Sequence, residues 1–244
     1  MQKRNAGVAI VGAGDFIGAA IARRFAAEGY DVHGGRRQGE KLKELEDEIA
    51  ASGGRFKGHT LDARTEEGIT AFLDMVEASS PLEVVIFNVG ANVNFPLLET
   101  TERVFRKVWE MACYAGFLTG REAARRMLPR GQGSIFFTGA TASMRGGKGY
   151  AAFAAAKAGL RATAQAMARE LGPQNIHVAH LVIDSGVDTA FVRERFAQRL
   201  GTTDIAPDVL MEPASIANAY WMLHQQTRDG WTHELDLRPY GETW

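Results

Sequence analysis

The sequence has little cysteine and no long hydrophobic run. Cys113 is the only cysteine among 244 residues, so an internal disulfide framework is excluded and a reducing compartment fits. No apolar stretch approaches the roughly 20 residues that a membrane-spanning helix needs. The apolar run from Ala6 to Val11 is too short for a signal peptide, and glycines interrupt it directly afterwards. We therefore expect a cytoplasmic protein that is neither exported nor embedded in a membrane.

The sequence also lacks an excess of charge of either sign. Its 28 Lys and Arg residues almost balance 29 Asp and Glu residues, and the formal net charge is −1. This balance provides no broad electrostatic surface for nucleic acid or for anionic lipid. His177 and His180 are three residues apart on a predicted strand and face opposite sides, so no metal site is expected. Chemistry on a small molecule is favoured.

Short apolar runs alternate with longer amphipathic segments along the chain. The predicted strands are Val8–Val11, Asp31–Gly34, Phe56–Leu61, Val84–Phe87, Ser134–Thr138, Ile176–Ile183 and a strand-like segment at Trp231–Arg238. The predicted helices are Ile17–Glu28, Glu40–Ala50, Thr65–Ala78, Thr101–Leu128 and Tyr150–Leu171. This alternation is typical of βαβ units. It predicts an α/β fold over residues 1–244 as one domain: a Rossmann-type, doubly wound parallel sheet in three α/β/α layers.

A glycine-rich turn joins the first predicted strand to the first predicted helix. Such a turn lets the backbone approach a pyrophosphate, and the free N–H groups of the helix start can face it. In this strand-turn-helix setting, a dinucleotide site is favoured over a simple tight turn. The residues of the turn that are predicted to bind the cofactor are Gly12, Asp15, Phe16, Ile17 and Gly18.

The second predicted strand is followed by Arg36 and Arg37, where an NAD-binding protein would usually carry an acid. Guanidinium groups can bind the 2′-phosphate of NADP(H) bidentately, so NADP(H) is favoured over NAD(H). The alternative is a solvated basic turn without a ligand.

Together these residues resemble the short-chain dehydrogenase/reductase superfamily over nearly the whole chain. The other matching motifs are Leu61-Asp62, Asn88-Val89-Gly90, Lys157 in the long alanine-rich helix, and Val187-Asp188-Thr189. The resemblance implies that Asp62 bonds the adenine and that the Asn88–Gly90 turn walls the adenosine ribose. It also implies that Thr189 reaches the nicotinamide carboxamide and that Lys157 binds the nicotinamide ribose.

The sequence departs from the family pattern at two places. In the glycine motif, Val11 replaces a threonine and Phe16 replaces the middle glycine. In the catalytic tetrad of Asn, Ser, Tyr and Lys, alignment on the lysine leaves only Lys157. The residues at the other three positions are Cys113, Ala140 and Phe153. The family's tyrosine delivers a proton to the substrate oxygen, and Phe153 has no hydroxyl with which to do this.

Another group has to supply the proton if the chain is an enzyme. Tyr150 lies three residues before Phe153 on the same face of the helix, and Lys157 becomes an acid if burial lowers its pKa. Thr138 and Thr141 are candidates for orienting the substrate oxygen in place of the serine. Tyr150 and Lys157 are the catalytic candidates, while a packing role for Tyr150 is the alternative.

Three further features concern the substrate and partners. Arg145 and Lys148 indicate either an anionic substrate or simple surface charge. Residues 189–212 resemble the family's substrate cover, and their apolar side chains suggest a partly apolar small molecule. The alanine-rich helix is of the kind that packs against a second subunit in the family, so we expect a homodimer or homotetramer.

Two functions from different classes remain open at this point. The first is an NADP(H)-dependent oxidoreductase with a rearranged proton donor, acting on a small carbonyl, alcohol or enone. The second is a catalytically inactive pseudoenzyme that binds NADP(H) and acts as a sensor or scaffold. The fold alone does not choose between them. An open, polar-lined cleft favours catalysis, whereas a cleft plugged by Phe16 and Phe153 favours the pseudoenzyme.

Overall fold

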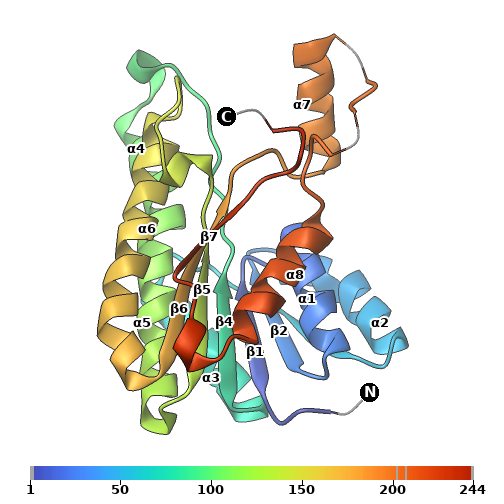
Figure 1. Ribbon diagram of the computed structural model, residues 1–244, viewed down its shortest axis with the longest axis vertical. Coiled ribbons are helices and arrows are strands. Elements are labelled where there is room, and N and C mark those ends of the chain that lie inside the picture. Colours follow the sequence, from blue (N-terminus) through green and yellow to red (C-terminus); the bar gives the residue numbers. More distant parts are fainter. Residues whose placement is uncertain (1–2, 202, 207, 243–244) are drawn as a thin grey trace.

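The computed structural model describes residues 3–201, 203–206 and 208–242. Within this part of the chain, seven strands form one parallel sheet in the order β3-β2-β1-β4-β5-β6-β7 (Figure 1). The strands are β1 (Gly7–Val11), β2 (Asp31–Arg36), β3 (Arg55–Thr60), β4 (Leu82–Phe87), β5 (Gly133–Thr138), β6 (Ile176–Ile183) and β7 (Glu234–Leu237). The predicted doubly wound α/β fold is confirmed.

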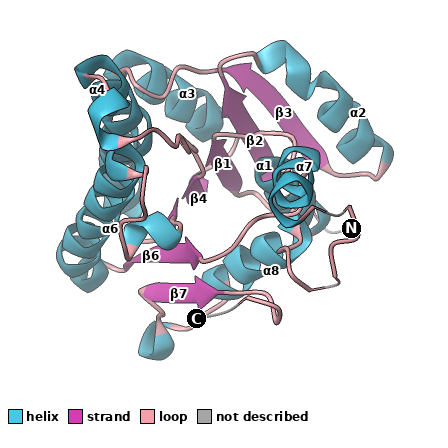
Figure 2. Cartoon of the chain, turned by 90° about the horizontal axis from the view of Figure 1, so that it is seen from above, coloured by secondary structure: helices cyan, strands magenta, loops and turns pink. Residues whose placement is uncertain are grey.

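Helices cover both faces of the sheet (Figure 2). One face carries α1 (Ile17–Ala27), α2 (Lys43–Ala51) and α8 (Pro213–His224), and the other carries α3 (Glu66–Ser79), α4 (Glu102–Trp109), α5 (Ala115–Met127) and α6 (Ala151–Leu171). The helix α7 (Ala190–Leu200) stands apart, beyond the carboxyl ends of the strands. This arrangement gives the three layers that the alternating pattern predicts.

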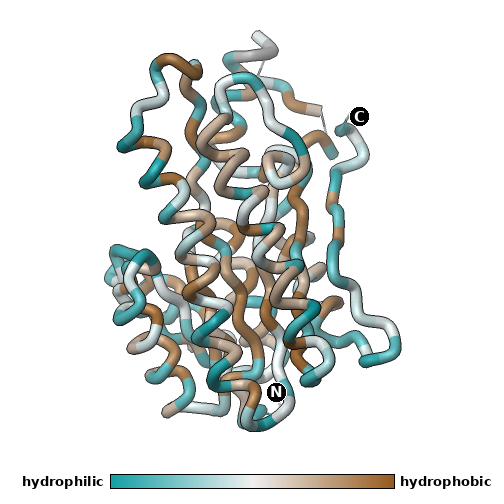
Figure 3. The backbone as a smooth tube through the Cα atoms, turned by 90° about the vertical axis from the view of Figure 1, so that its left-hand side faces the viewer, coloured by the Kyte–Doolittle hydropathy of each residue, from teal (hydrophilic) through white to brown (hydrophobic). Residues whose placement is uncertain are grey.

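The central strands β1, β4, β5 and β6 are mostly apolar because both of their faces are buried, whereas the edge strands β3 and β7 are partly exposed. On β1, Val8 and Ile10 pack into the core beneath α1 and α8, whereas Ala9 and Val11 pack into the core beneath α3 and α5. Side chains alternate between the two faces of a strand, so each of these central strands supplies both cores. Figure 3 shows the resulting hydrophobic stretches in brown, running through the middle of the molecule.

Four elements differ from the sequence prediction. The predicted helix over 101–128 is interrupted by a π-helical turn at Glu110–Tyr114, which separates α4 from α5. The helices α7 and α8 were not predicted; α8 buries Ile216, Tyr220 and Trp221 and lacks a clear amphipathic stripe. At the end of the chain, only Glu234–Leu237 of the predicted strand-like segment pairs with β6.

The described residues include no helix that is long and apolar enough to cross a membrane.

The carboxyl ends of the parallel strands all meet at one edge of the sheet. The strand order changes direction at β1, which lies between β2 and β4. In doubly wound folds, ligands bind in the crevice at such a switch point. The turns after β1, β2 and β4 therefore mark where a site should lie.

Candidate functional site

A large cavity opens above the carboxyl ends of the strands, with a volume of about 1340 Å³. The structure brings every predicted site residue to its wall. The predicted residues on the wall are Gly12, Asp15, Phe16, Ile17, Gly18, Arg36, Arg37, Leu61, Asp62, Asn88, Val89, Gly90, Tyr150, Lys157 and Thr189. Residues from six separate turns and helices thus converge on one space.

The glycine turn has the geometry of a phosphate cradle. Gly12 has φ +94°, and a Cβ there would lie 2.7 Å from the carbonyl oxygen of Asn88. A Cβ on Gly18 would lie 2.6 Å from Cα of Ala13. At the start of α1, Phe16 is the N-cap residue and makes no side-chain cap hydrogen bond. Backbone N–H groups at the helix start are therefore available to an anion, and the turn fits a pyrophosphate.

Phe16 is accommodated in the turn without a left-handed backbone. Its φ is −107°, outside the left-handed region that favours glycine. Its ring is 45% exposed at the wall of the cavity. Phe16 therefore adds an apolar side chain to the wall at this turn.

Three arginines and two carboxylates lie on the turns after β1, β2 and β3, at one end of the cavity. Arg36 forms a salt bridge with Asp15, and Arg37 is exposed. Arg64 donates from Nε to Oδ1 of Asp62 over 2.8 Å, and its Nη2 bonds Oδ2. These bonds hold the pKa of Asp62 below its usual range. Arg64 was not singled out from the sequence, although a cation two residues after the family's adenine-binding acid is a visible signal.

A chain of hydrogen bonds links the glycine turn to α8 through the sheet. Asn88 donates from Nδ2 to the carbonyl oxygen of Gly12 over 3.0 Å, and its Oδ1 accepts from the Thr138 hydroxyl over 3.0 Å. Since that hydroxyl has one hydrogen, Tyr220 donates in the 2.7 Å contact with Thr138. Burial raises the pKa of Tyr220. The hypothesis that Thr138 orients a substrate is wrong, because its single hydrogen is already donated inside the protein.

Lys157 is buried at the base of the cavity, and its side chain is fixed by two backbone carbonyls. Its Nζ donates to the oxygen of Thr138 over 2.8 Å and to that of Val89 over 3.2 Å. One of its three hydrogens therefore remains for a ligand. Burial lowers the pKa of Lys157 to about 8.

Apolar residues surround the position where the family carries its proton donor. Phe153 is 7% exposed, and its ring centroid lies 6.0 Å from Nζ of Lys157. Ala140 lines the cavity beside it, whereas Cys113 is buried in the cluster behind Phe153 and does not line the cavity. Burial raises the pKa of the Cys113 thiol. These three positions supply no hydroxyl or amide to a substrate.

Tyr150 carries a hydroxyl on the same wall. It precedes the first residue of α6, is half-buried, and its ring centroid lies 6.5 Å from that of Phe153. Among the hydrogen bonds of the described residues, none engages the Tyr150 hydroxyl. Its oxygen is therefore available to a molecule in the cavity.

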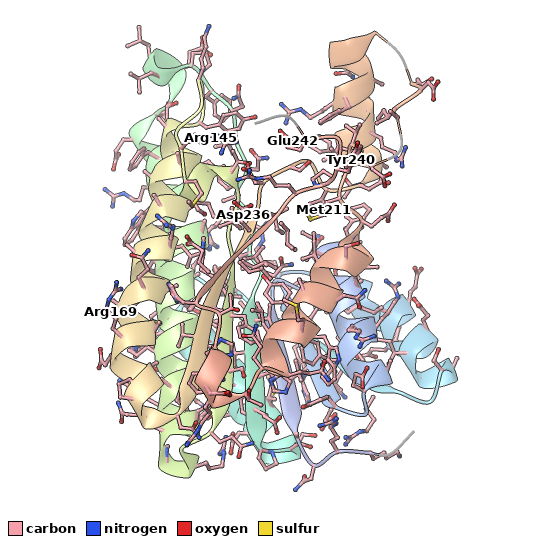
Figure 4. All side chains as sticks on the ribbon, in the orientation of Figure 1. Arg145, Arg169, Met211, Asp236, Tyr240 and Glu242 are labelled. Carbon is pink, nitrogen blue, oxygen red and sulfur yellow. The ribbon has the colours of Figure 1, made fainter. Side chains whose placement is uncertain are left out.

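Arg145 is held on the wall by a buried carboxylate. Both terminal nitrogens of Arg145 donate to Asp184 over 3.1 Å, and Asp184 also pairs with Arg238. Figure 4 shows Arg145 on the α6 side of the opening and Tyr240 on the α7 side. Lys148 is exposed and does not line the cavity. Of the two cations considered from the sequence, only Arg145 is placed to meet a ligand.

The predicted cover begins at Thr189, whose hydroxyl accepts a hydrogen bond from the N–H of Val192 and caps α7. Val192 and Phe196 present apolar side chains to the cavity. Residues 202 and 207 of the predicted cover lie outside the described residues.

Across the described ranges, no group of His, Cys, Asp and Glu side chains could hold a metal ion.

Residues 6–200 match the family model for short chain dehydrogenases. The chain belongs to the short-chain dehydrogenase family. A 3-oxoacyl-[acyl-carrier-protein] reductase, MabA, of Mycobacterium avium is 30% identical over 226 residues, which cover 87% of this chain and 84% of the relative. The relatives that match this chain include proteins named as dehydrogenases and reductases.

Two solved structures resemble this one over almost their whole length. A short-chain dehydrogenase from Rhodopseudomonas palustris is 60% identical, with a TM-score of 0.84, and the match covers 97% of this chain and 100% of that chain. An actinorhodin polyketide ketoreductase crystallised with NADPH is 24% identical, with a TM-score of 0.86, and the match covers 97% and 98% of the two chains. At that identity, the second likeness concerns the fold alone.

Proposed function

We propose that the chain is an NADP(H)-dependent oxidoreductase that acts on a small carbonyl, alcohol or enone. When bound, the nicotinamide would supply or accept the hydride. The observation that carries this proposal is the continuous cavity, which runs from the arginines of the adenosine end to Lys157 and Tyr150. Phe16 and Phe153 lie on its wall and do not fill it. Its volume of about 1340 Å³ exceeds the roughly 300–1,000 Å³ of ordinary small-molecule pockets. This favours an enzyme over a plugged pseudoenzyme.

The cofactor roles follow from the groups on the wall. The N-terminus of α1, from Asp15 to Gly18, would hold the pyrophosphate, and Arg36 with Arg37 would favour a 2′-phosphate. Asn88–Gly90 would wall the adenosine ribose next to Leu61, and Thr189 would meet the carboxamide. The remaining hydrogen of Lys157 would bond the nicotinamide ribose.

We propose Tyr150 as the proton donor for the substrate oxygen. It has a hydroxyl that no described residue engages, it lines the cavity, and it lies beside the ring that replaces the family's tyrosine. Lys157 assists from below, because its lowered pKa lets it take up or release a proton near neutral pH. Thr141, on the same wall, remains the candidate for orienting the oxygen.

The substrate side of the cavity is partly apolar, which supports a partly apolar small molecule. Its apolar lining includes Met111, Val192, Phe196 and Val209.

We also propose that the chain forms a homodimer or homotetramer in the cytoplasm. Exposed rings on the outer face of α4 and α5, with Trp109 stacked on Tyr114 at 5.8 Å, support such self-association. Light scattering of the purified chain tests this assembly.

The variant Tyr150→Phe tests the proton donor. Loss of a positioned acid should lower turnover by roughly 10²- to 10⁴-fold, while the affinity for NADPH stays unchanged. Turnover is followed as NADPH oxidation with a panel of small ketones and enones, and affinity by calorimetry. Tyr114→Phe is the matched control, since Tyr114 does not line the cavity. Full activity in Tyr150→Phe would exclude Tyr150 as the donor.

A further inference from the structure

We infer that Arg145 binds an anionic group of the substrate, so that the reacting carbonyl or alcohol belongs to a carboxylic acid or a phosphate ester rather than to a neutral molecule. This inference rests on the proposed function and deepens it, because it names the class of molecule that the same cavity takes. The sequence leaves an anionic substrate and simple surface charge open for Arg145. The contacts of Arg145 and its place on the wall favour the first.

Asp184 orients the Arg145 guanidinium from within the protein. Asp184 is 2% exposed, and its Oδ2 and Oδ1 accept hydrogen bonds over 3.1 Å from Nη1 and Nη2 of Arg145. A two-point contact between planar charged groups fixes the plane of the guanidinium as well as its position. Asp184 directly follows β6, and the next two residues, Ser185 and Gly186, line the cavity. The guanidinium is therefore held at the carboxyl end of β6.

The Arg145 guanidinium keeps a second pair of donors for a ligand. It has five N–H groups, and the bonds to Asp184 use one hydrogen on each terminal nitrogen. Among the hydrogen bonds of the described residues, the Arg145 side chain makes no others. Nε and Nη2, which lie on the same side of the group, each keep a hydrogen. Two oxygens of a carboxylate or of a phosphate can accept these two hydrogens at once.

The carboxylates near Arg145 leave it accessible to a molecule in the cavity. The Arg145 side chain lines the cavity and is 56% exposed, whereas Asp184 does not line it. Asp184 is also shared with Arg238, whose other partner, Asp236, lies off the cavity wall as well. Glu242 does line the cavity, but it forms no ion pair with Arg145 within the described ranges. A ligand therefore meets the donors of the guanidinium and not the carboxylate behind them.

Arg145 shares its stretch of wall with the proposed proton donor. It belongs to the loop that precedes α6, and Tyr150 is the N-cap residue of that helix. Both line the cavity, as do the apolar side chains of Val192 and Phe196 from α7. This arrangement fits a substrate whose carbonyl meets Tyr150, whose anionic group meets Arg145 and whose carbon chain contacts α7.

The kinetic test uses 3-oxohexanoate, 4-oxohexanoate and 5-oxohexanoate, which place the ketone at different distances from the same carboxylate. Each acid is compared with its methyl ester, which keeps the ketone and lacks the charge, and turnover is followed as NADPH oxidation. In the wild type, kcat/KM should be at least about tenfold higher for one acid than for its ester, because the ester loses a charge-assisted pair. This preference should disappear in Arg145→Met. Lys148→Met is the matched control and should keep it, since Lys148 is an exposed cation of the same loop that does not line the cavity.

Arg145→Met also leaves the buried Asp184 with one guanidinium fewer, which destabilises the chain and would repel an acid. The double variant Arg145→Met/Asp184→Asn removes that charge, and it should lose the preference for the acid in the same way. Arg145→Lys, which keeps the charge without the paired donors, should show an intermediate preference. Melting curves identify any variant that fails to fold. A folded double variant that prefers the acid as strongly as the wild type does would overturn the inference.

Binding without turnover separates this inference from the proposed function. Ligand-observed NMR with the NADP⁺-saturated chain compares hexanoate and hexyl phosphate with the neutral hexanamide, none of which carries a ketone. The wild type should bind one of the two anions at least about tenfold more tightly than hexanamide, and Arg145→Met should not. The anion that shows this effect identifies the group as a carboxylate or a phosphate.

The outcomes distinguish the two claims. If the wild type reduces the esters but prefers neither the oxo acids nor the two anions, the inference fails and the proposed function stands. If no compound is turned over, the proposed function fails, and the loss of anion preference in Arg145→Met alone decides whether Arg145 binds an anion.

Discussion

The two ends of the cavity are built from different kinds of groups. At the adenosine end, Arg36 and Arg64 are fixed by Asp15 and Asp62, and Arg37 is exposed beside them. At the proposed reacting end, Phe153 and Ala140 line the cavity without a hydroxyl, at the positions where the family resemblance predicts a tyrosine and a serine. One end carries paired charges, whereas the other combines the buried amine of Lys157 and the Tyr150 hydroxyl with the apolar side chains of Phe153 and Ala140.

Under the proposed function, this difference separates cofactor binding from catalysis. The donors proposed to bind the dinucleotide at the adenosine end do not include the residues at the tetrad positions Cys113, Ala140 and Phe153. Lys157 contributes to both ends. Its Nζ is fixed by the carbonyl oxygens of Val89 and Thr138, and the same atom lies 6.0 Å from the centroid of the Phe153 ring. Changes at the reacting end should therefore alter turnover while leaving nucleotide affinity in place.

Restoring the family's tyrosine should erase the difference at the reacting end and give the largest effect. Phe153→Tyr places a hydroxyl four residues before Lys157, where the buried cation can lower its pKa. In the Tyr150→Phe background, which lacks the proposed donor, this change should raise ketone reduction by roughly 10²- to 10⁴-fold, measured as NADPH oxidation.

Phe153→Leu is the control for this gain, because it removes the ring without adding a hydroxyl. It should not accelerate the reaction. If Tyr150→Phe/Phe153→Tyr were no faster than Tyr150→Phe, a hydroxyl at position 153 would not be able to supply the proton at this site.

The buried amine of Lys157 should give a pH-dependent contribution to stability. Its pKa is about 8 in the folded chain, below the ordinary 10.5, so the unfolded chain holds more protons between these values. Stability should therefore rise with pH through this window, and below pH 8 the full cost of burying the charge applies. Relative to Lys157→Met, the wild type should gain about 3 kcal/mol of unfolding free energy across the window.

Urea unfolding of both proteins from pH 7 to pH 10.5 measures this gain. Comparing the two removes the contribution of other titrating groups, such as Tyr30 and Tyr220, whose pKa values are raised. A difference that stays constant with pH would show that Lys157 is not desolvated in the folded chain.

Substitutions in the glycine turn should have a smaller effect, on stability and NADPH binding. Gly14 serves as the control for Gly12. Gly12→Ala forces a side chain onto φ +94° and puts Cβ 2.7 Å from the Asn88 oxygen. It should cost about 1–3 kcal/mol of stability and weaken NADPH binding. Gly14→Ala has no heavy atom within 4 Å of its Cβ and should change stability by less than about 0.5 kcal/mol. Equal effects of the two changes would contradict the cradle geometry.

The fold was predictable because its signals are local. Short apolar strands such as β1 and β6 stand out when both faces are buried, and the glycine turn lies between a strand and a helix. The helix α8 was missed because its buried residues spread around the helix, so no stripe marks it. The π-helical turn at Glu110–Tyr114 was missed because it continues the apolar pattern of its neighbours.

The positions of the site residues were predictable, but their pairings were not. Motif order brought Asp62 and Lys157 to the same cavity. The sequence does not reveal that Asp62 is occupied by Arg64, or that Thr138 is bonded to Tyr220 from a helix 82 residues later in the chain. Such contacts depend on side-chain rotamers and on tertiary packing.

The most direct test of the account is calorimetric titration of the wild-type chain with NADP⁺ and NAD⁺ under identical salt. The arginines at the adenosine end predict that NADP⁺ binds at least about tenfold more tightly than NAD⁺. This preference should persist in Tyr150→Phe and in Phe153→Tyr, because neither change touches that end. Equal affinity for the two nucleotides, or no binding of either, would contradict the separation of a charged adenosine end from an altered reacting end.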